Sequence, residues 1–492
     1  KSKRIYFENN NIKGSISLIG ARIDDLEFKK FKETLNGNKN ITLLNPKKVQ
    51  NGYYVETGWA TTSKNIDVPN AESIWEIEGN TKLTPNSPVK LVWLNDQKIK
   101  FEKKIRIDEQ YLFTVKQSII NNSQKTYNFY PYGQIIRNEI PEITNFFILH
   151  EGPHGVFNSE LVEKDYDDIQ DKPHSVNADK GWLGITDKYW IASIIPQENR
   201  KFRADFDYKN KFRTNFIESN ATEIGANETK SNEIKILLAA KEVRIIDEYA
   251  KKLNIEKLDL VIDWGYLYFL TRPMWFALDY FFNLLGNYGL AIIAVTVCIR
   301  IVLFPLAQMS FRSMSRMKLL QPEMTRLKEL HKEDKVKLQQ EMMALYKREK
   351  VNPMSGCLPI LPMIFIFFSL YKVLFVTLDG RHEPFFLWIK DLSERDPTSI
   401  FNLFGLIPWD PPTFLLIGAW PILMGISMYI QQLLNPQMPD PVQRKIFQFF
   451  PLVLTIILAP FPSGLVIYWT VNNVLQMGQQ YLVLRQTKIK TT

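Results

Sequence analysis

The pattern of apolar and polar residues changes character at about residue 262. Before that point, short runs such as 99–107 and 111–115 place apolar residues at every second position, and turn signals such as Asn51-Gly52 separate the runs. This alternation predicts half-buried β-strands, and so many in succession predict a large antiparallel sandwich over residues 1–245. Further strands are expected over Ile16–Ile23, Tyr53–Ala60, Lys90–Leu94, Tyr127–Tyr130 and Trp182–Ile195.

Residues 246–286 predict two helices of different kinds. The first part places apolar residues at helical spacing, which indicates a helix that links the β region to the apolar second half of the chain. Leu267–Leu285 is aromatic and apolar, but Arg272, Asp279 and Asn283 lie on about one of its faces. Such a helix is expected to lie in the membrane interface rather than to cross the bilayer. The alternative, that it continues the first spanning segment, stays open.

Five later runs are long and apolar enough to predict membrane spans, since the hydrocarbon core of a bilayer needs about 20 residues of helix. The first span falls within 287–310, and residues 353–484 hold the other four together with an outer loop over 379–412. Pro460-Phe461-Pro462 makes a tight break, which predicts a hairpin between the last two. The expected spans are 289–310, 356–378, 413–434, 446–461 and 463–484.

The distribution of positive charge predicts which side of the membrane each connection faces. Residues 311–352 carry eleven Lys and Arg, whereas 379–412 carries three against six acidic residues. The connection 435–445 ends in Arg444-Lys445, and the short tail, 485–492, is basic. Because cytoplasmic loops carry an excess of Lys and Arg, the two basic connections and the C-terminus are expected in the cytoplasm. The β region is then expected outside it.

The segment 311–352 predicts a cytoplasmic hairpin of two helices with a net charge of +5, from eleven basic and six acidic residues. Three roles stay open for it: a solvated hairpin that merely obeys topology, a surface for anionic lipid heads, or a contact for the ribosome, whose RNA attracts Lys and Arg. Charge alone does not choose among them. The apolar stripes expected to pack together are Met317, Leu320, Met324 and Leu327 on one helix and Leu338, Met342 and Leu345 on the other.

Arg300 is the residue around which we expect the membrane part to be organised. It lies near the middle of an apolar run, and its charge cannot be removed by loss of a proton. At bilayer depth such a cation costs about 2.5–3.5 kcal/mol. No Asp or Glu lies in the core of any predicted span, so a hydrated, positively charged concavity is a better interpretation than a buried ion pair. Polar residues also recur at helical spacing in the spans, and for these the alternative of joining helices stays open: Thr296, Gln308, Ser427, Gln431, Gln448, Thr455, Asn472, Gln476, Gln479 and Gln480.

Motifs for catalysis or metal binding are not evident in the sequence. Cys298 and Cys357 define no disulfide framework and no metal cluster. The string His150-Glu151-Gly152-Pro153-His154 matches the HExxH zinc motif, but Gly-Pro breaks the helix on which that motif depends. A Gly-rich phosphate loop and a nucleophile elbow are not recognisable either. The sequence therefore predicts no enzyme, no catalytic residue, no metal and no cofactor.

The first ten residues, KSKRIYFENN, contain no apolar signal segment. A β region outside the cytoplasm must be exported, so we expect an upstream signal or anchor that this sequence does not include.

Several stretches resemble one family, the YidC membrane-protein insertases of Gram-negative bacteria. They lie in the family's order over nearly all of 264–484, whereas 1–245 matches by position and β character more than by motif. The stretches are VTVCIRIVLFPL (295–306), MKLLQPEM (317–324), QEMMALYKREKVNPMSGCLP (340–359), PFFLWIKDLSERDP (384–397) and FPSGLVIYWTVNN (461–473).

The resemblance implies a membrane α-helical bundle of five spans plus an N-terminal all-β periplasmic super-sandwich, similar to sugar-mutarotase folds. It also implies a hydrophilic groove in the bundle, open to cytoplasm and lipid and closed outside. The family's groove arginine corresponds to Arg300, its threonine to Thr296, and its aromatic pair to Tyr468 and Trp469. The residues expected to line the substrate groove are Arg300, Thr296, Gln308, Gln431, Gln448, Tyr468, Trp469, Asn472 and Gln476.

The resemblance further implies an insertase and chaperone in the bacterial inner membrane, which inserts nascent client proteins alone or beside the Sec translocon. The expected partners are clients, the translocon, membrane lipids and, through 311–352, the ribosome; DNA is not among them. A client's hydrophilic tail is expected to enter the groove, and its apolar helix to leave along the third and last spans. Two alternatives from other classes are a solute transporter, which would favour internal repeats that we do not detect, and an envelope scaffold, in which Arg300 would have no purpose.

Overall fold

A computed structural model describes residues 4–63, 66–143, 149–351, 360–409, 411–412, 415–434 and 441–489. Cys357, the first residues of the expected span 356–378 and the end of the basic tail lie outside these residues. The chain divides into two compact units, which we call the β unit, Lys1–Asp263, and the helical unit, Trp264–Thr492.

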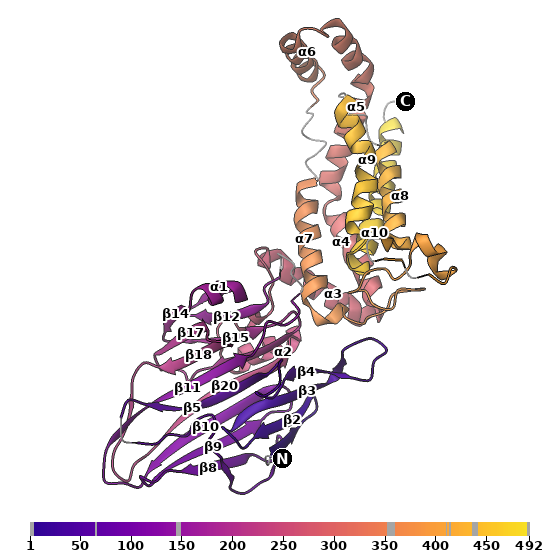
Figure 1. Ribbon diagram of the computed structural model, residues 1–492. Helices are drawn as coiled ribbons and strands as arrows, with labels where there is room; N and C mark the ends of the chain where they lie inside the picture. Colours follow the sequence, from indigo (N-terminus) through magenta and orange to yellow (C-terminus); the bar gives the residue numbers. More distant parts are fainter. Residues whose placement is uncertain are drawn as a thin grey trace. The chain divides into compact units, whose positions relative to one another are not determined.

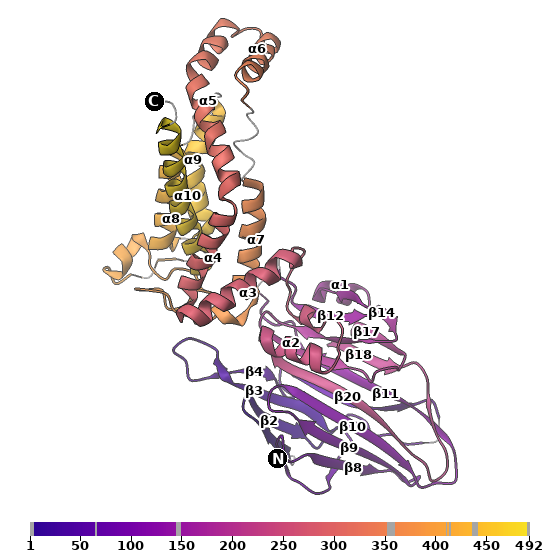
Figure 2. The ribbon, with the colours of Figure 1, turned by 180° about the vertical axis from the view of Figure 1, so that it is seen from behind.

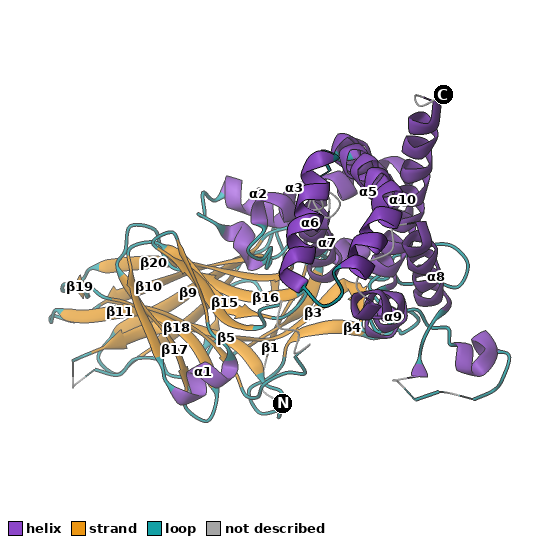
Figure 3. Ribbon diagram, turned by 90° about the horizontal axis from the view of Figure 1, so that it is seen from above, coloured by secondary structure: helices purple, strands orange, loops and turns teal. Residues whose placement is uncertain are grey.

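The β unit contains two sheets, one of eleven strands and one of nine (Figures 1 and 3). The first has the order β14 (His174–Ala178), β17 (Phe202–Tyr208), β18 (Phe212–Glu218), β11 (Tyr127–Arg137), β5 (Tyr53–Thr61), β3 (Arg22–Lys32), β2 (Ile12–Ser17), β1 (Arg4–Glu8) and β7 (Lys82–Leu83), with β19 (Thr222–Ile224) on β11 and β4 (Asn40–Leu44) on β3. The second has the order β13 (Glu160–Glu163), β12 (Gly152–Phe157), β15 (Gly181–Thr186), β16 (Trp190–Ile195), β20 (Thr229–Ala240), β10 (Leu112–Asn121), β9 (Ile99–Ile107), β8 (Val89–Leu94) and β6 (Glu76–Ile77).

Aromatic side chains from the inner faces of the two sheets meet to form the core. The rings of Phe7 on β1 and Phe113 on β10 pack edge to face with centroids 5.1 Å apart. Phe101 on β9 and Phe129 on β11 do the same at 5.8 Å. These rings come from strands whose alternate residues are buried, as expected for a sandwich of two sheets. The predicted β-sandwich is therefore confirmed.

Two of the predicted strands are wrong in detail. Residues 16–23 contain a turn between β2 and β3, in which Gly20 and Ala21 take the positive φ angles of 72° and 49°. Trp182–Ile195 is a hairpin of β15 and β16 rather than one strand. The β unit also contains helix α1 (Tyr166–Asp171), which the alternation did not predict, the linking helix α2 (Val243–Lys252) and the 3-10 turn η1 (Leu258–Val261).

The helical unit has a central helix, α10, which packs against α4, α5, α7 and α8 (Figures 1 and 2). Helix α3 packs against α4 and α7 and runs across the end of the bundle at which α4 begins. The helices are α3 (Tyr268–Leu285), α4 (Tyr288–Val302), α5 (Phe304–Leu330), α6 (Lys335–Arg348), α7 (Ile360–Val376), α8 (Ala419–Leu434), α9 (Pro441–Leu458) and α10 (Ser463–Ile489), with 3-10 turns η3 (Leu378–Gly380) and η4 (Ile400–Gly405).

The segment expected as one helix over 289–310 is bent. Helix α4 ends at Val302, α5 begins at Phe304, and the angle between them is 64°. Pro305 stands in the first turn of α5, where a missing N–H is tolerated, but its ring does not allow α4 to continue unbroken. Among the described residues no single helix combines the length and hydropathy of a membrane span; α4 and α5 do so only together, as this bent pair. The count of five spans stays a prediction.

Helix α3 is separate from α4, so the alternative of one continuous helix is wrong. Gly286 ends α3 with a φ of 66°, the left-handed conformation that glycine adopts without steric cost. Asn287 then caps α4, because its side-chain oxygen accepts a hydrogen bond of 3.0 Å from the backbone N–H of Leu290. Exposed Phe269, Phe276 and Tyr280 lie along α3.

Candidate functional site

Arg300 lies in the last turn of α4, where α10 runs beside it. Its Nε–H donates a hydrogen bond of 2.7 Å to Oδ1 of Asn472. Its Nη2 donates to the backbone oxygen of Asn472 at 3.1 Å and to Oε1 of Gln476 at 2.9 Å. Gln479 completes the contact, because its side-chain amide donates to the backbone oxygen of Arg300 at 3.0 Å. The guanidinium is therefore held by neutral amide oxygens of α10.

The Arg300 side chain is not neutralised by an acid. Within the described part of the chain, no carboxylate oxygen lies within 4.0 Å of the guanidinium, and only 6% of the residue is exposed. A guanidinium has five N–H groups, and the three hydrogen bonds use the one on Nε and the two on Nη2. The two on Nη1 make no hydrogen bond with any described residue. They are the donors that this site can offer to a further acceptor.

Thr296 and the aromatic pair lie near Arg300 along the same two helices. Thr296 is buried, and its hydroxyl donates to the backbone oxygen of Ile292 at 2.6 Å, within its own helix. Tyr468 is also buried, one turn before Asn472 on α10. The ring of Trp469 packs edge to face on Phe367 of α7, with centroids 4.7 Å apart. Thr296 and Tyr468 therefore lie beside the guanidinium without binding it, whereas Trp469 packs toward α7, α8 and α9.

The structure brings only some of the predicted groove residues together. Asn472 and Gln476 bind Arg300, whereas Gln308 is half-buried on α5, Gln431 is half-buried on α8, and Gln448 is exposed on α9. These last three make no side-chain hydrogen bond with any described residue. Their place in a groove stays a prediction.

Helix α10 uses its amides in two ways, on two faces. Asn472, Gln476 and Gln479 recur at intervals of four and three residues and face α4. Asn473 donates to the hydroxyl of Ser427 on α8 at 2.9 Å, and Gln480 donates to the backbone oxygen of Leu434 at 3.3 Å. The second set joins helices, which is the alternative that the sequence left open. Gln479 was recognised as polar but not assigned to the groove, although its spacing from Gln476 was the available signal.

The loop between α7 and α8 closes one end of the bundle with a buried carboxylate at its centre. Asp396, which is 2% exposed, accepts hydrogen bonds from the indole of Trp388 at 3.1 Å, from Thr398 and from the backbone N–H of Trp420 at 2.9 Å. Since Trp420 lies in the first turn of α8, the carboxylate caps that helix. The loop is thereby fixed to the start of α8.

The same loop is also fixed to α10 and α4. The backbone oxygens of Leu392 and Glu394 accept from the N–H groups of Gly464 and Ser463, at the start of α10, at 3.0 and 2.7 Å. The ring of Phe385 packs so closely on Gly289 of α4 that a side chain there would overlap it. The loop therefore ties together three helices at this end.

Lys372 is a second cation in an apolar helix, and the sequence analysis did not consider it. It lies near the end of α7 and is 7% exposed. Its Nζ would be 3.8 Å from a Cβ placed on Gly265, whose φ is 70°.

The hairpin of α5 and α6 packs through the apolar stripes. Met324 and Leu345 are both 3% exposed, while the other stripe residues on both helices are partly buried. Arg348 reaches across to Glu323, with a nitrogen–oxygen distance of 2.7 Å. Exposed Val336 and Met343 line a shallow groove on α6 together with Gln339, Gln340, Ala344 and Lys347.

The HExxH-like string of the β unit does not form a helix. His154 lies in β12 and is buried against Trp182, and burial lowers its pKa well below the usual value. His150 contacts Asp165 at 3.3 Å and the backbone oxygen of Pro153 at 3.2 Å. Their ring centroids are 6.1 Å apart. The arrangement is that of a strand packed in a sandwich, not of a zinc motif on a helix face.

Comparisons with known proteins cover almost the whole chain. The family model described as "YidC periplasmic domain" matches residues 4–277, and the model described as "60Kd inner membrane protein" matches residues 280–491. The chain is 63% identical over 492 residues to the membrane protein insertase YidC of Pelagibacter ubique (strain HTCC1062), which spans 100% of this chain and 88% of the relative. It is 44% identical over 499 residues to the YidC of Brucella suis biovar 1 (strain 1330), covering 100% and 82%.

Solved structures that match include a crystal structure of an active YidC insertase with its first transmembrane domain resolved. It is 15% identical, covers 97% of this chain and 92% of that one, and has a TM-score of 0.40. A galactose mutarotase related enzyme from Lactobacillus acidophilus covers 48% of this chain and 97% of its own, at 10% identity and a TM-score of 0.35. On the family models and the sequence relatives, this chain belongs to the YidC family, with an N-terminal β-sandwich periplasmic domain and a helical C-terminal part.

Proposed function

We propose that this chain inserts client proteins into the bacterial inner membrane through a polar site organised by Arg300. The relatives named membrane protein insertases support the general activity. The observation that carries the specific site is a buried guanidinium held by amide oxygens, with no carboxylate partner among the described residues. Such a group keeps its full positive charge, whereas a structural ion pair would cancel it.

The two N–H groups on Nη1 are the proposed contact for the client. A hydrophilic tail that enters from the cytoplasm would otherwise cross the full low-dielectric core, at a cost of several kcal/mol for each charged group. Hydrogen bonds from a cation to a carboxylate contribute about 1.5–3 kcal/mol, so acidic tails gain most. Because the amides already hold the rest of the guanidinium, the arginine needs no rearrangement to bind. Thr296 and Tyr468 form the wall near it.

The client's apolar helix then leaves into lipid along α8 and α10. Leu423, Ile426 and Ile430 are exposed on α8, and Val474 and Leu482 are exposed on α10. Transfer of the client's apolar surface from water to lipid supplies the driving force, without nucleotide hydrolysis. The remaining predicted groove residues, Gln308, Gln431 and Gln448, belong to this path in the proposal.

The topology that this function requires has five spans. The β domain and the loop 379–412 lie in the periplasm, and the segment 311–352, the connection 435–445 and the C-terminus lie in the cytoplasm. Residues 246–286 link the domains and lie along the interface. The Asp396-centred loop closes the outer end of the path, which supports a groove that opens only inward. The α5–α6 hairpin covers the inner mouth and receives clients, with the Sec translocon and the ribosome as further partners.

The experiment is reconstitution of the full chain into liposomes with two single-span clients that differ only in tail charge, one acidic and one neutral. Arg300→Ala should reduce insertion of the acidic-tail client by tenfold or more, whereas Arg300→Lys should retain most of it. Arg485→Ala, an exposed arginine on α10, is the matched control. Normal insertion of the acidic-tail client by Arg300→Ala would refute the charge role, and solute flux without insertion would indicate a transporter instead.

A further inference from the structure

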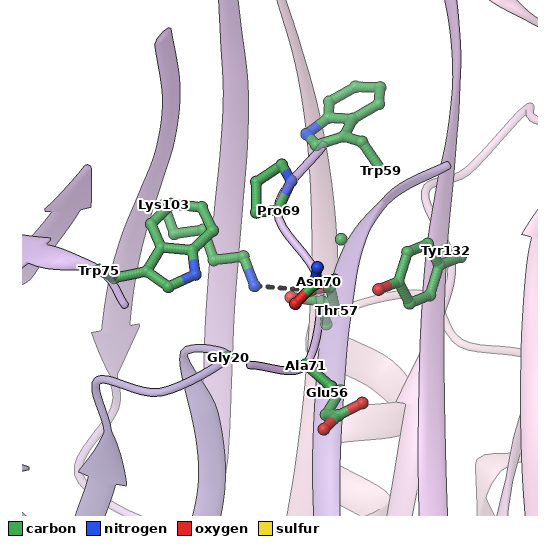
Figure 4. Close-up of a pocket in the computed structure, with 11 residues that line it drawn as sticks. Gly20, Glu56, Thr57, Trp59, Pro69, Asn70, Ala71, Trp75, Lys103 and Tyr132 are labelled. Carbon is green, nitrogen blue, oxygen red and sulfur yellow. Dashed lines mark hydrogen bonds between the residues drawn. The ribbon is translucent and has the colours of Figure 1, made fainter. Parts of the chain in front are cut away.

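A small cavity lies between the two sheets of the β unit, and three aromatic and two charged residues are among those that line it (Figure 4). Strand β5 contributes Thr57 and Trp59, β9 contributes Lys103, and Trp75 and Tyr132 complete much of the wall. The space open to the centre of a water-sized sphere is about 10 Å³. That is about the space that one water-sized guest occupies and far too little for a sugar or a peptide.

Among the residues that the structure describes, Lys103 is a buried cation of this region without an ion-pair partner. Glu56 also lines the cavity, but Arg22 lies 3.5 Å from its carboxylate. Asp24 in turn lies between Arg22, at 3.9 Å, and Arg4. Both carboxylates are thus engaged by arginines, and no described carboxylate lies within 4.0 Å of the Lys103 amine. A buried net charge is costly unless a counter-charge accompanies it.

Several buried hydrogen-bond donors around the cavity have no acceptor in the described structure. The Lys103 amine donates to the backbone oxygen of Thr57 at 2.5 Å and lies over the ring of Trp75, 5.0 Å from its centroid. Its other two N–H groups make no hydrogen bond with any described residue. The indole N–H groups of Trp59 and Trp75 are buried and have no partner in the described structure. All three residues are at most 3% exposed. In Figure 4 the Trp75 nitrogen lies on the side of its ring nearer to the Lys103 amine. A buried donor left unpaired costs about 1–3 kcal/mol, so an acceptor is expected here.

We propose that this cavity binds a monovalent anion of halide size, with chloride as its natural occupant. An anion accepts hydrogen bonds from every direction and supplies the missing negative charge. A water molecule accepts only two and supplies none. The proposal does not depend on the insertase activity, since it concerns the interior of the β unit alone.

The charge of Lys103 gives the site a pH dependence. Burial lowers the pKa of Lys103 to about 8, while Glu56, backed by Arg22, remains its only close anionic neighbour among the described residues. Tyr132 faces the same space, but burial raises its pKa to about 12, so it stays neutral. Loss of the lysine proton removes the charge that attracts the anion. Anion occupancy of the cavity is therefore expected to fall as the pH rises through and above 8. A bound anion raises the pKa of Lys103, so it shifts this fall to a higher pH.

Hydrogen–deuterium exchange of the full chain in nanodiscs tests the proposal in solution. Chloride is compared with gluconate at pH 7 and equal ionic strength, so that screening of surface charge is the same. Chloride at ten times its dissociation constant should slow exchange of the β5 and β9 peptides about elevenfold. Lys103→Met should abolish the slowing. Lys104→Met is the matched control, because Lys104 is the next residue on β9 and points to solvent.

Crystals soaked in bromide locate the ion directly. An anomalous peak is expected beside Lys103 and Trp75 at pH 7 and not at pH 10. Trp75→Phe, which keeps the lysine and removes one donor, should weaken the chloride effect several-fold, and it serves if Lys103→Met does not fold. A cavity without anomalous signal, or a chloride effect that persists in Lys103→Met, would overturn the proposal in favour of a bound water or a neutral lysine.

Discussion

At the scale of single residues, Arg300 shows how far its surroundings could be predicted. The sequence indicated that the cation has no acid in its own or neighbouring spans, and the structure pairs it with Asn472 and Gln476. That pairing depends on how α4 and α10 are aligned along their axes. Arg300 and Asn472 lie 172 residues apart along the chain. No local pattern sets such a register. Spacing alone would have placed Gln479 on the same face of α10 as Gln476. It would not have shown which helix that face contacts.

The charge of Arg300 can be tested without changing it. Gln476→Glu places a carboxylate where an amide oxygen now accepts from Nη2 at 2.9 Å. The new ion pair would satisfy the guanidinium internally, so insertion of an acidic-tail client should fall by roughly tenfold or more, given about 1.5–3 kcal/mol for a hydrogen bond to a charged group. Insertion rates in liposomes measure this. The neutral-tail client should be unaffected, and equal losses for both clients would instead indicate damage to the fold.

Glu218 gives a pH prediction for the β unit. It is 2% exposed on β18 and accepts a hydrogen bond of 2.6 Å from Asn232 on β20, in the other sheet. Burial raises its pKa to about 7, against the opposing effects of Arg200 and Asn232. The folded protein therefore binds more protons than the unfolded chain between the unfolded pKa, about 4.3, and pH 7. The free energy of unfolding falls as the pH rises through this window, by up to about 4 kcal/mol.

Glu218→Gln should remove that pH dependence, because a neutral amide has no proton to lose. The variant is expected to be more stable than the parent at pH 8 and to match it near pH 4.5. Urea unfolding followed by the β-sheet circular dichroism band measures the difference at both values. A difference that is the same at pH 4.5 and pH 8 would mean that the carboxylate does not titrate in this range.

At the scale of elements, periodicity predicted types of structure better than their interruptions. The sandwich strands and α2, α3 and α6 followed from alternation or helical spacing. The turn at Gly20 and the bend before Phe304 did not, because an apolar run continues across each of them. Pro305 was the available signal for the bend. Helix α1 is too short for a helical period to stand out.

Two glycines in helices of the same unit give opposite predictions for one substitution. Gly478 on α10 has open space around it, so Gly478→Ala should stabilise by up to about 1 kcal/mol through helix propensity. Gly289 lies in the first turn of α4, and a Cβ there would overlap the ring of Phe385. Gly289→Ala should therefore destabilise, by about 1–3 kcal/mol, as overpacked cores do. Thermal unfolding of both variants in detergent measures whether each substitution raises or lowers the stability.

Protease sensitivity separates the two glycine variants further. Displacing Phe385 loosens the loop that holds α4, α8 and α10 together, so Gly289→Ala should be cut faster within 379–412. Gly478→Ala should be cut at the parent rate. If both variants are cut alike, the loop does not depend on the Phe385 contact.

At the scale of the whole molecule, the division into a β unit and a helical unit was predictable to within about 20 residues. The structure separates them after Asp263, and the change in sequence pattern falls at about the same place. This agreement arises because the two units obey different rules: alternation at every second residue in one, long apolar helices in the other. The side of the membrane on which the β unit and the hairpin lie is predicted from charge and not from contacts within either unit.

Chemical labelling tests that placement. In a cysteine-free background, exposed Lys104 of the β unit, Leu403 of the outer loop and Lys347 of α6 are each changed to Cys. A maleimide that cannot cross membranes, added to spheroplasts, should label Lys104→Cys and Leu403→Cys but not Lys347→Cys until the membrane is broken. This contrast requires that α4 with the start of α5 crosses the bilayer once, between the β unit and the hairpin, and that α7 crosses it once more, between the hairpin and the loop. Protection of Leu403→Cys alongside labelling of Lys104→Cys would mean that one of these segments does not cross. The orientation predicted from the positive charges of 311–352 would then be wrong. The proposed groove would also have no opening to the cytoplasm.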